Sequence, residues 1–181
     1  MGCAQSQPSS HQGKHRVNDV DLQLARAREE ERTHYKVLLL GPGEAGKSTV
    51  LKQLKCIYKG GIPIAEQRMH GRAILKNTIQ CMQAILTAMG HLGLSVDSRL
   101  RGAKSRVAAL PESGGITPSI AKDIAALWRD RGVQKAYSQR SRYWILDAAA
   151  YYFKHVERFA AHGFAPNEED MIMARAKTSG M

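Results

Sequence analysis

The sequence lacks several features that would place it outside the reducing interior of a cell. It contains no run of about eighteen apolar residues, so it offers no transmembrane helix. Its first residues lack the apolar core of a secretory signal. Cysteine occurs only at positions 3, 56 and 81, a spacing that forms neither a metal-ligand motif nor a disulfide framework. We therefore expect Cys56 and Cys81 to be small buried side chains in a cytosolic protein.

Acidic residues are also scarce. The 181 residues carry 16 Asp and Glu against 27 Lys and Arg, a formal net charge of +11. The whole excess lies in residues 50–145, which hold 16 basic and 5 acidic side chains. Such an excess can mark a nucleic-acid-binding face. Here the charges are scattered along predicted helices without interleaved aromatic residues, so we expect no nucleic-acid partner.

The first 34 residues read as a tail followed by an exposed helix. Residues 1–16 are polar and predict a loose segment. Residues 18–32 contain no helix breaker and have rich i,i+4 charge pairing, which predicts a helix. Apolar residues such as Val20 and Leu24 form a narrow stripe on it. That stripe fits a partner surface, and a frayed solvated tail is the competing interpretation.

One strand and several helices are predicted downstream. The apolar run Tyr35 to Leu40 has no polar alternation, as in a strand buried on both faces of a parallel sheet. A glycine-rich loop and a helix reaching about Tyr58 follow it. The remaining residues predict a mainly helical region, with no internal repeat. Its predicted segments are a long helix over 65–94, loops or short irregular helices over 95–116, and helices over 117–130, over 139–161 and after the N-cap Asn167.

The loop after the predicted strand has the spelling of a phosphate-binding loop. Residues 41–48, "GPGEAGKS", fit G-x-x-x-x-G-K-[ST]. Glycines allow several backbone N–H groups to converge on phosphate oxygens, and the following helix adds the positive end of its dipole. Lys47 supplies a cation and Ser48 a hydroxyl for Mg²⁺. A glycine-rich turn with an incidental lysine is the competing interpretation, but the strand before and the helix after favour a nucleotide-phosphate site.

The N-terminus carries a second motif. "MGCAQS" fits M-G-x-x-x-[ST], the acceptor pattern for N-myristoylation at Gly2. The adjacent Cys3 could take a reversible palmitoyl chain. One acyl chain anchors weakly and two anchor stably, so the adjacency predicts a lipid anchor.

Together these segments resemble a heterotrimeric G-protein alpha subunit over nearly the whole chain. "MGCxxS", "KVLLLGPGEAGKST" and "LKQLKCIY" match the family's lipidated start, phosphate loop and first helix. "NTIQCMQAILTAMGHL" and "ALWRDRGVQKAYSQRSRYWILDAAAYYF" resemble its helical insert, and "PNEEDMIMARAKTSG" resembles its linker into switch I. The resemblance implies an α/β P-loop NTPase, a Ras-like GTPase core of which only the first strand and helix are present, with an all-α inserted helical domain. The chain itself would then be mostly α.

The resemblance also implies site residues. Arg175 would be the catalytic arginine supplied in cis, and Ser48 and Thr178 would be the hydroxyl ligands of Mg²⁺. Asp147 would reach the nucleotide from the insert. The implied nucleotide-binding residues are Gly43, Glu44, Ala45, Gly46, Lys47, Ser48, Thr49, Asp147, Ala148, Ile172, Met173, Ala174, Arg175, Ala176, Lys177 and Thr178.

Each of these roles has a plainer alternative. In these alternatives Arg175 pairs with Glu44 or lies in solvent. Asp147 is then an exposed helix acid, and Thr178 is disordered without nucleotide. Pro42, Ala45, Ala148 and Met173 depart from the family's usual residues, which bears on nucleotide affinity more than on identity.

The implied function is a GTP-dependent molecular switch with GTP/GDP and Mg²⁺ as cofactors. Its partners would be a beta-gamma dimer, a G protein-coupled receptor, an effector and the cytoplasmic face of the plasma membrane, reached through lipids on Gly2 and Cys3. The helix at 18–32 would dock on beta-gamma. Two alternatives stay open: a non-hydrolysing, membrane-anchored module that binds beta-gamma, and an ATP-using P-loop enzyme with a helical lid.

The family's later segments do not occur in these 181 residues. They include further strands, a D-x-x-G-Q segment and the guanine-selecting N-K-x-D segment. We therefore expect a truncated alpha subunit or gene model, with little GTP hydrolysis by this chain alone and weak support for residues 35–58. The predicted domains are a lipidated tail and helix (1–34), the first strand, loop and helix of a GTPase domain (35–62), the helical insert (63–171) and the linker into switch I (172–181).

Overall fold

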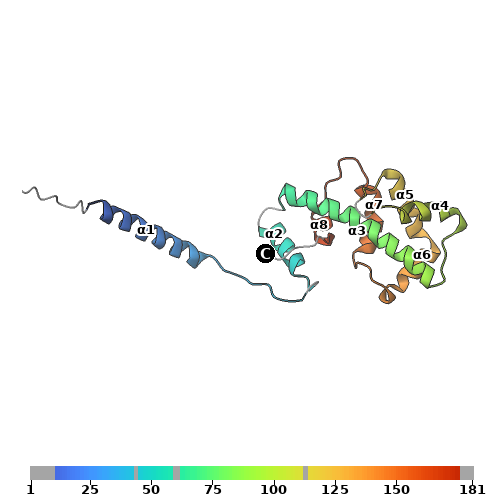
Figure 1. Ribbon diagram of the computed structural model, residues 1–181, viewed down its shortest axis with the longest axis horizontal. Helices are drawn as coiled ribbons and strands as arrows, with labels where there is room; N and C mark the ends of the chain where they lie inside the picture. Colours follow the sequence, from blue (N-terminus) through green and yellow to red (C-terminus); the bar gives the residue numbers. More distant parts are fainter. Residues whose placement is uncertain (1–10, 43–44, 59–61, 112–113, 176–181) are drawn as a thin grey trace, which may run out of the picture. The chain divides into compact units, whose positions relative to one another are not determined.

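The computed structural model describes residues 11–42, 45–58, 62–111 and 114–175 (Figure 1). The chain divides into two compact units, Met1–Ala45 and Gly46–Met181, and each is described by itself. Among the described residues, no helix combines the length and the apolar character needed to cross a membrane.

The first unit contains one helix, α1, over His11–Thr33. It confirms the helix predicted for 18–32 and begins earlier. Its C-terminal end is bonded locally: the Thr33 hydroxyl donates to the Glu30 carbonyl at 2.8 Å, and Lys36 Nζ donates to Glu31 Oε1 at 2.6 Å. Val20, Leu22 and Leu24 are half exposed or more. The apolar stripe of this helix is therefore open to contact.

The strand predicted for Tyr35–Leu40 is not formed. Residues 34–40 have no strand assignment, and Tyr35, Val37 and Leu40 are 94%, 80% and 81% exposed. A parallel strand needs neighbours that pair with its N–H and C=O groups. The described part of this chain contributes no such neighbour, so the apolar run lies uncovered.

The second unit is a helical bundle around one long helix, α3, over Ile64–His91 (Figure 1, green). Helices α4, α6, α7 and α8 pack against α3, while α5 packs against α4, α6 and α7, and α2 packs against α8. The bounds of these other helices are Lys47–Tyr58 (α2), Arg101–Ala108 (α4), Pro118–Arg129 (α5), Arg131–Ser138 (α6), Ala149–Phe159 (α7) and Glu168–Met173 (α8), with 3₁₀ turns at Ser98–Leu100 (η1) and Arg140–Arg142 (η2).

The long predicted helix and its buried face are confirmed. Ile79, Met82 and Met89 are fully buried and Leu86 is 5% exposed, whereas Leu75 is only partly buried. These side chains recur at steps of three and four, which places them on one face of a helix. They form the core together with apolar residues of α5 and α7.

Two predicted helix starts are confirmed by their caps. The Thr117 side chain accepts from the Ile120 N–H, with Pro118 in the first turn of α5. Asn167 caps α8 in a reciprocal arrangement, because its side chain accepts from the Asp170 N–H and the Asp170 side chain accepts from the Asn167 N–H. All three bonds use N–H groups that the start of a helix leaves without intrahelical partners.

The helix predicted for 139–161 forms only over Ala149–Phe159, as α7. Residues 139–148 are a turn, the 3₁₀ turn η2 and a following segment in which Tyr143 has extended backbone angles (φ −149°, ψ 162°). Leu146 is buried, and Tyr143 and Ile145 pack against the core from this extended segment. The tertiary burial of these side chains outweighs their local helical pattern.

The sequence analysis also did not predict α6. Asp130 ends α5 and caps α6 through the Val133 N–H, so one residue separates two helices that the sequence pattern did not resolve.

The prediction that both Cys56 and Cys81 are buried is half right. Cys81 is buried as expected, and its burial raises the pKa of the thiol to about 11. Cys56 is only partly buried.

Candidate phosphate-binding site

A left-handed glycine immediately precedes the start of α2. Gly46 has φ +80°, a left-handed conformation that residues with a side chain rarely adopt. The Val50 N–H donates to the Gly46 carbonyl at 3.0 Å, and helical hydrogen bonding begins with this bond. Lys47 and Ser48, the first two residues of α2, are partly buried, and Thr49 is exposed. A helix start directs N–H groups and positive dipole potential outward, and both suit an anion.

The segment that carries Arg175 is fastened to α2 by a buried lysine. Lys52 Nζ donates to the Met171 carbonyl at 2.9 Å and to the Ala174 carbonyl at 2.5 Å. The Lys52 side chain is 7% exposed. Its burial lowers the pKa of the ammonium group, and the negative charge of Glu66 acts in the opposite direction.

Two further side chains hold the same backbone from other helices. Asn77 of α3 donates from Nδ2 to the Arg175 carbonyl at 3.0 Å. The Tyr152 hydroxyl of α7 donates to the Met173 carbonyl at 2.6 Å. The backbone from Met171 to Arg175 is therefore bonded to α2, α3 and α7.

The Arg175 side chain lies against an exposed aromatic ring. Its guanidinium carbon is 5.6 Å from the centroid of the Trp144 ring, within cation–π range. Trp144 is 62% exposed and belongs to the extended segment that precedes α7. The predicted alternative, a pair between Arg175 and Glu44, involves a residue outside the described ranges.

The predicted insert residues lie on that same segment. Asp147 is exposed in the turn before α7, and Ala148 is the N-cap residue of α7. A surface pocket of about 410 Å³ is lined by Ser138, Arg140, Ser141, Ile145 and Asp147. Arg175 is not among the residues that line this pocket.

The start of α8 is fixed to α7 by a buried carboxylate. Asp170 is fully buried. It accepts hydrogen bonds from both terminal nitrogens of Arg158, at 2.7 and 2.6 Å, and from the Tyr151 hydroxyl at 2.7 Å. Burial works to raise the pKa of Asp170, but the hydrogen bonds from Arg158 and Tyr151 outweigh it, so this pKa lies below its ordinary value.

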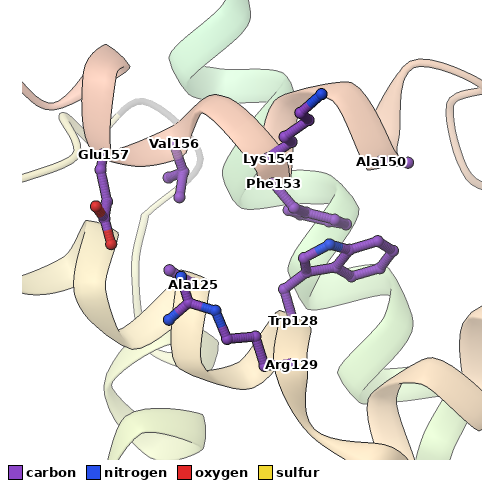
Figure 2. Close-up of a pocket in the computed structure, with 8 residues that line it drawn as sticks. All are labelled: Ala125, Trp128, Arg129, Ala150, Phe153, Lys154, Val156 and Glu157. Atoms are coloured by element: carbon purple, nitrogen blue, oxygen red, sulfur yellow. The ribbon is translucent and has the colours of Figure 1, made fainter.

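A second surface pocket lies away from the predicted nucleotide residues. Figure 2 shows it between α5 and α7, with the Trp128 ring beside Phe153 and the charged side chains of Arg129, Lys154 and Glu157 around it. Its volume is about 420 Å³. None of the residues that line it belongs to the predicted nucleotide-binding set.

Several predicted site residues lie outside the described ranges. They are Gly2, Cys3, Gly43, Glu44, Ala176, Lys177 and Thr178. Of the two predicted Mg²⁺ ligands, only Ser48 is therefore described, and it lies on the first turn of α2. Among the described residues, no group of three or more His, Cys, Asp or Glu side chains could hold a metal ion.

The sequence reasoning missed the residues that position the Arg175 segment. Asn77 is a polar residue in the middle of a helix with an apolar face, and that placement was a usable signal. Lys52 gave no signal, because a lysine one turn into a helix usually lies in solvent. Only tertiary structure shows that it is buried.

Comparison with known proteins agrees with these features. The model of the family described as G-protein alpha subunit matches residues 14–181. Curated relatives include a guanine nucleotide-binding protein subunit alpha from Cryphonectria parasitica, 39% identical over 185 residues, and the guanine nucleotide-binding protein alpha-8 subunit from Dictyostelium discoideum, 42% identical over 188 residues. Each alignment covers 100% of this chain, but 52% and 45% of the respective relative.

The chain thus spans about half the length of the curated relatives it matches. The family match covers well over half of this chain, and it includes the turn at Gly46, the helical bundle and the Arg175 segment. On this evidence the chain belongs to the G-protein alpha subunit family.

Proposed function

We propose that this protein binds the phosphates of GDP and GTP at the start of α2 and acts as a guanine-nucleotide-dependent signalling switch. One observation carries the proposal: α2 begins at Lys47 directly after the left-handed Gly46, and the same helix is bonded through Lys52 to the segment that bears Arg175. The relatives' printed names, guanine nucleotide-binding proteins, support guanine as the base.

Each predicted residue has a distinct role in this proposal. The turn from Gly43 to Thr49 would surround the phosphates with N–H groups, and Lys47 would neutralise their charge. Ser48 and Thr178 would hold Mg²⁺, which, when bound, neutralises charge on the phosphate oxygens. Arg175 would stabilise the charge that develops on the transferred phosphoryl group, which makes it the proposed catalytic residue. Asp147 and Ala148, with the residues from Ile172 to Lys177, would line the remainder of the nucleotide site.

Equilibrium binding of a fluorescent GTP analogue, with and without Mg²⁺, tests the proposal. Lys47→Ala should weaken binding by about tenfold or more, because a hydrogen bond to a charged group contributes about 1.5–3 kcal/mol. Lys122→Ala removes the same charge from an exposed position on α5 and should leave binding unchanged. Competition with unlabelled GTP and ATP then measures base preference. Equal affinities for the wild type and Lys47→Ala would contradict the proposal.

A membrane-anchored interaction with a beta-gamma dimer is proposed alongside nucleotide binding. Its support is α1, whose residues Val20, Leu22 and Leu24 are exposed on a helix of 23 residues. Leu24→Glu should reduce capture of the chain on immobilised beta-gamma, whereas Gln23→Glu adds the same charge at the neighbouring position and should not. An equal loss of capture in both variants would show that the added negative charge weakens the interaction, and that the apolar stripe of α1 does not dock on beta-gamma.

The lipid anchor, and with it the place of the protein at the cytoplasmic face of the plasma membrane, is a proposal from the N-terminal motif. Intact-mass measurement of protein made in eukaryotic cells should show a myristoyl group that Gly2→Ala abolishes, and a hydroxylamine-sensitive acyl group that Cys3→Ala abolishes. Coupling of a receptor to an effector would follow from these attachments.

A further inference from the structure

The Arg175 backbone is held by an unusual concentration of long-range side-chain donors. Within the five residues from Met171 to Arg175, four carbonyl groups accept hydrogen bonds from the side chains of Lys52, Asn77 and Tyr152. The last carbonyls of a helix have no intrahelical partners, and a cation at this end is favoured by the helix dipole. The short helix α8 therefore receives its C-terminal bonds from outside itself.

Lys52 differs from the other two donors in the helix to which it belongs. Asn77 and Tyr152 extend from α3 and α7 of the core, whereas Lys52 extends from α2, the helix whose first residue is Lys47. Lys52 lies five positions after Lys47, which corresponds to a rise of about 7.5 Å along one helix. A displacement of the start of α2 therefore moves the Lys52 ammonium group as well.

The neighbouring lysine has a different contact. Lys55 Nζ pairs with Glu66 Oε2 of α3 at 2.8 Å, and both side chains are partly buried. Lys55 thus links α2 to α3, while Lys52 links α2 to the end of α8. The two lysines form a matched pair on one helix for separating these contributions.

We propose that Lys52 is a positioning residue that couples the phosphate-binding turn of α2 to Arg175 through the carbonyls of Met171 and Ala174. The inference rests on the proposed function for its nucleotide-dependent part. Binding of phosphate at Lys47 shifts α2, and the two hydrogen bonds of Lys52 carry that shift to the backbone that precedes the Arg175 guanidinium.

Tryptophan provides the measurement. The Arg175 guanidinium lies over Trp144, whereas Trp128 is packed against Tyr137 and Phe153 at centroid distances of 4.9 and 4.8 Å. In the full chain labelled with 5-fluorotryptophan, ¹⁹F NMR should give one signal for each ring, assigned with Trp144→Phe. The Trp144 signal then reports the position of Arg175, and the Trp128 signal reports the integrity of the bundle.

Lys52→Met keeps an unbranched side chain that is one heavy atom shorter, and it removes the donors. In nucleotide-free protein it should shift or broaden the Trp144 signal and leave the Trp128 signal in place, while Lys55→Met should leave both signals unchanged. A Trp144 signal identical in the wild type and Lys52→Met would overturn the proposal. If Lys52→Met alters the Trp128 signal, Tyr152→Phe replaces it, because it removes a single hydroxyl group, which donates to the Met173 carbonyl and accepts from Asn77 Nδ2 at 3.5 Å. That variant must then displace the Trp144 signal, and an unchanged signal counts against the proposal.

Addition of GDP and Mg²⁺ tests the coupling itself. Saturating nucleotide should shift the Trp144 signal in the wild type, and this shift should be lost in Lys52→Met while nucleotide affinity stays within about threefold, since Lys52 does not belong to the phosphate-binding turn. An equal shift in both proteins would refute coupling through Lys52. Absence of nucleotide binding in the wild type would refute the proposed function and the coupling, whereas the nucleotide-free comparison still decides whether Lys52 positions Arg175.

Discussion

Asp170 combines two roles in one side chain. Its carboxylate accepts from the Asn167 N–H as part of the cap of α8, and it also accepts from Arg158 and Tyr151 of α7. The sequence predicted three acids at the start of this helix, favoured by the helix dipole. It did not distinguish Asp170, which is fully buried, from Glu168 and Glu169, which are exposed, because the distinction depends on the partners from α7.

Asp170→Asn should lower the free energy of unfolding by about 3 kcal/mol, because it leaves a buried set of donors without its charged acceptor. Chemical denaturation followed by circular dichroism measures this loss. Asp123→Asn is the control, because the partner of Asp123 is Arg106, whose side chain is 60% exposed. This substitution should lower the free energy of unfolding by about 1 kcal/mol or less. Similar losses of unfolding free energy in the two variants would show that burial of Asp170 does not increase its contribution to stability.

The same carboxylate predicts a pH dependence. Its pKa is depressed in the folded protein, so its contribution to stability is complete above the ordinary value of 3.8 and is lost as the pH falls through the folded value. Below about pH 4 the wild type should therefore lose stability more steeply than Asp170→Asn. Denaturation midpoints measured from pH 3 to pH 7 check this, and parallel curves for the two proteins would contradict it.

At the scale of helices, α6 is placed by a close approach that only glycine permits. A Cβ on Gly132 would meet the Ser95 carbonyl oxygen and lie 3.1 Å from Met89 Cε. Asp130 supports the same junction, because its carboxylate accepts from the N–H groups of Val133 and Asp97. The loop after α3 therefore packs directly against the start of α6.

Gly132→Ala should therefore destabilise the protein, although alanine in a helix interior normally stabilises by about 1 kcal/mol relative to glycine. Gly102→Ala in α4 is the matched control, because its Cβ would meet only the flexible end of the Arg106 side chain. Thermal unfolding should show a lower midpoint for Gly132→Ala and an equal or higher one for Gly102→Ala. A raised midpoint for Gly132→Ala would mean that the loop at Ser95 yields freely.

Local chemistry explains which helices could be predicted. Thr117 with Pro118, and Asn167 with its acids, are start signals that act within one turn, and both helices begin where these residues predict. The start of α6 immediately after α5 and the break at residues 143–148 depend on Asp130, Tyr143 and Leu146 contacting other parts of the bundle. Patterns of spacing along the chain do not contain that information.

The exposed apolar segment leads to a further expectation. Val37 to Leu40 have no ladder partner in the described chain, so their amides should exchange with solvent at close to unfolded rates, whereas the amides of Ile79 to Met89 in α3 should be strongly protected. Hydrogen exchange followed by mass spectrometry measures both. Strong protection at Val37–Leu40 in the purified monomer would show that this segment finds a partner strand.

At the scale of the whole molecule, the helical bundle should fold without the first unit. Its contacts lie among neighbouring helices of residues 46–181, and its core residues all belong to that range. A chain restricted to residues 46–181 should therefore unfold cooperatively, with a thermal midpoint within a few degrees of the full chain. A midpoint far lower, or a broad transition, would show that the first unit contributes to the core.

The fold class was only partly predictable from the sequence, because helices depend on local pattern whereas strands depend on neighbouring strands. Helices satisfy their backbone groups within themselves, so most helices of the bundle follow from local pattern, and the structure contains them. The α/β class implied by family membership needs a sheet, and a strand is completed only by its neighbours. In the described residues the run from Tyr35 to Leu40 has none, so the class rests on membership of the family.

Tyr151 and Tyr152 are consecutive residues of α7, yet their hydroxyls reach opposite ends of the turn at Asp170 and Met173. The two bonds together set the number of residues that can lie between those positions. A one-residue insertion or deletion after Asp170 would satisfy one tyrosine and misplace the other, and it would rotate the Arg175 side chain by about 100° around the helix axis. Natural variation in this segment should therefore proceed by substitution at constant length.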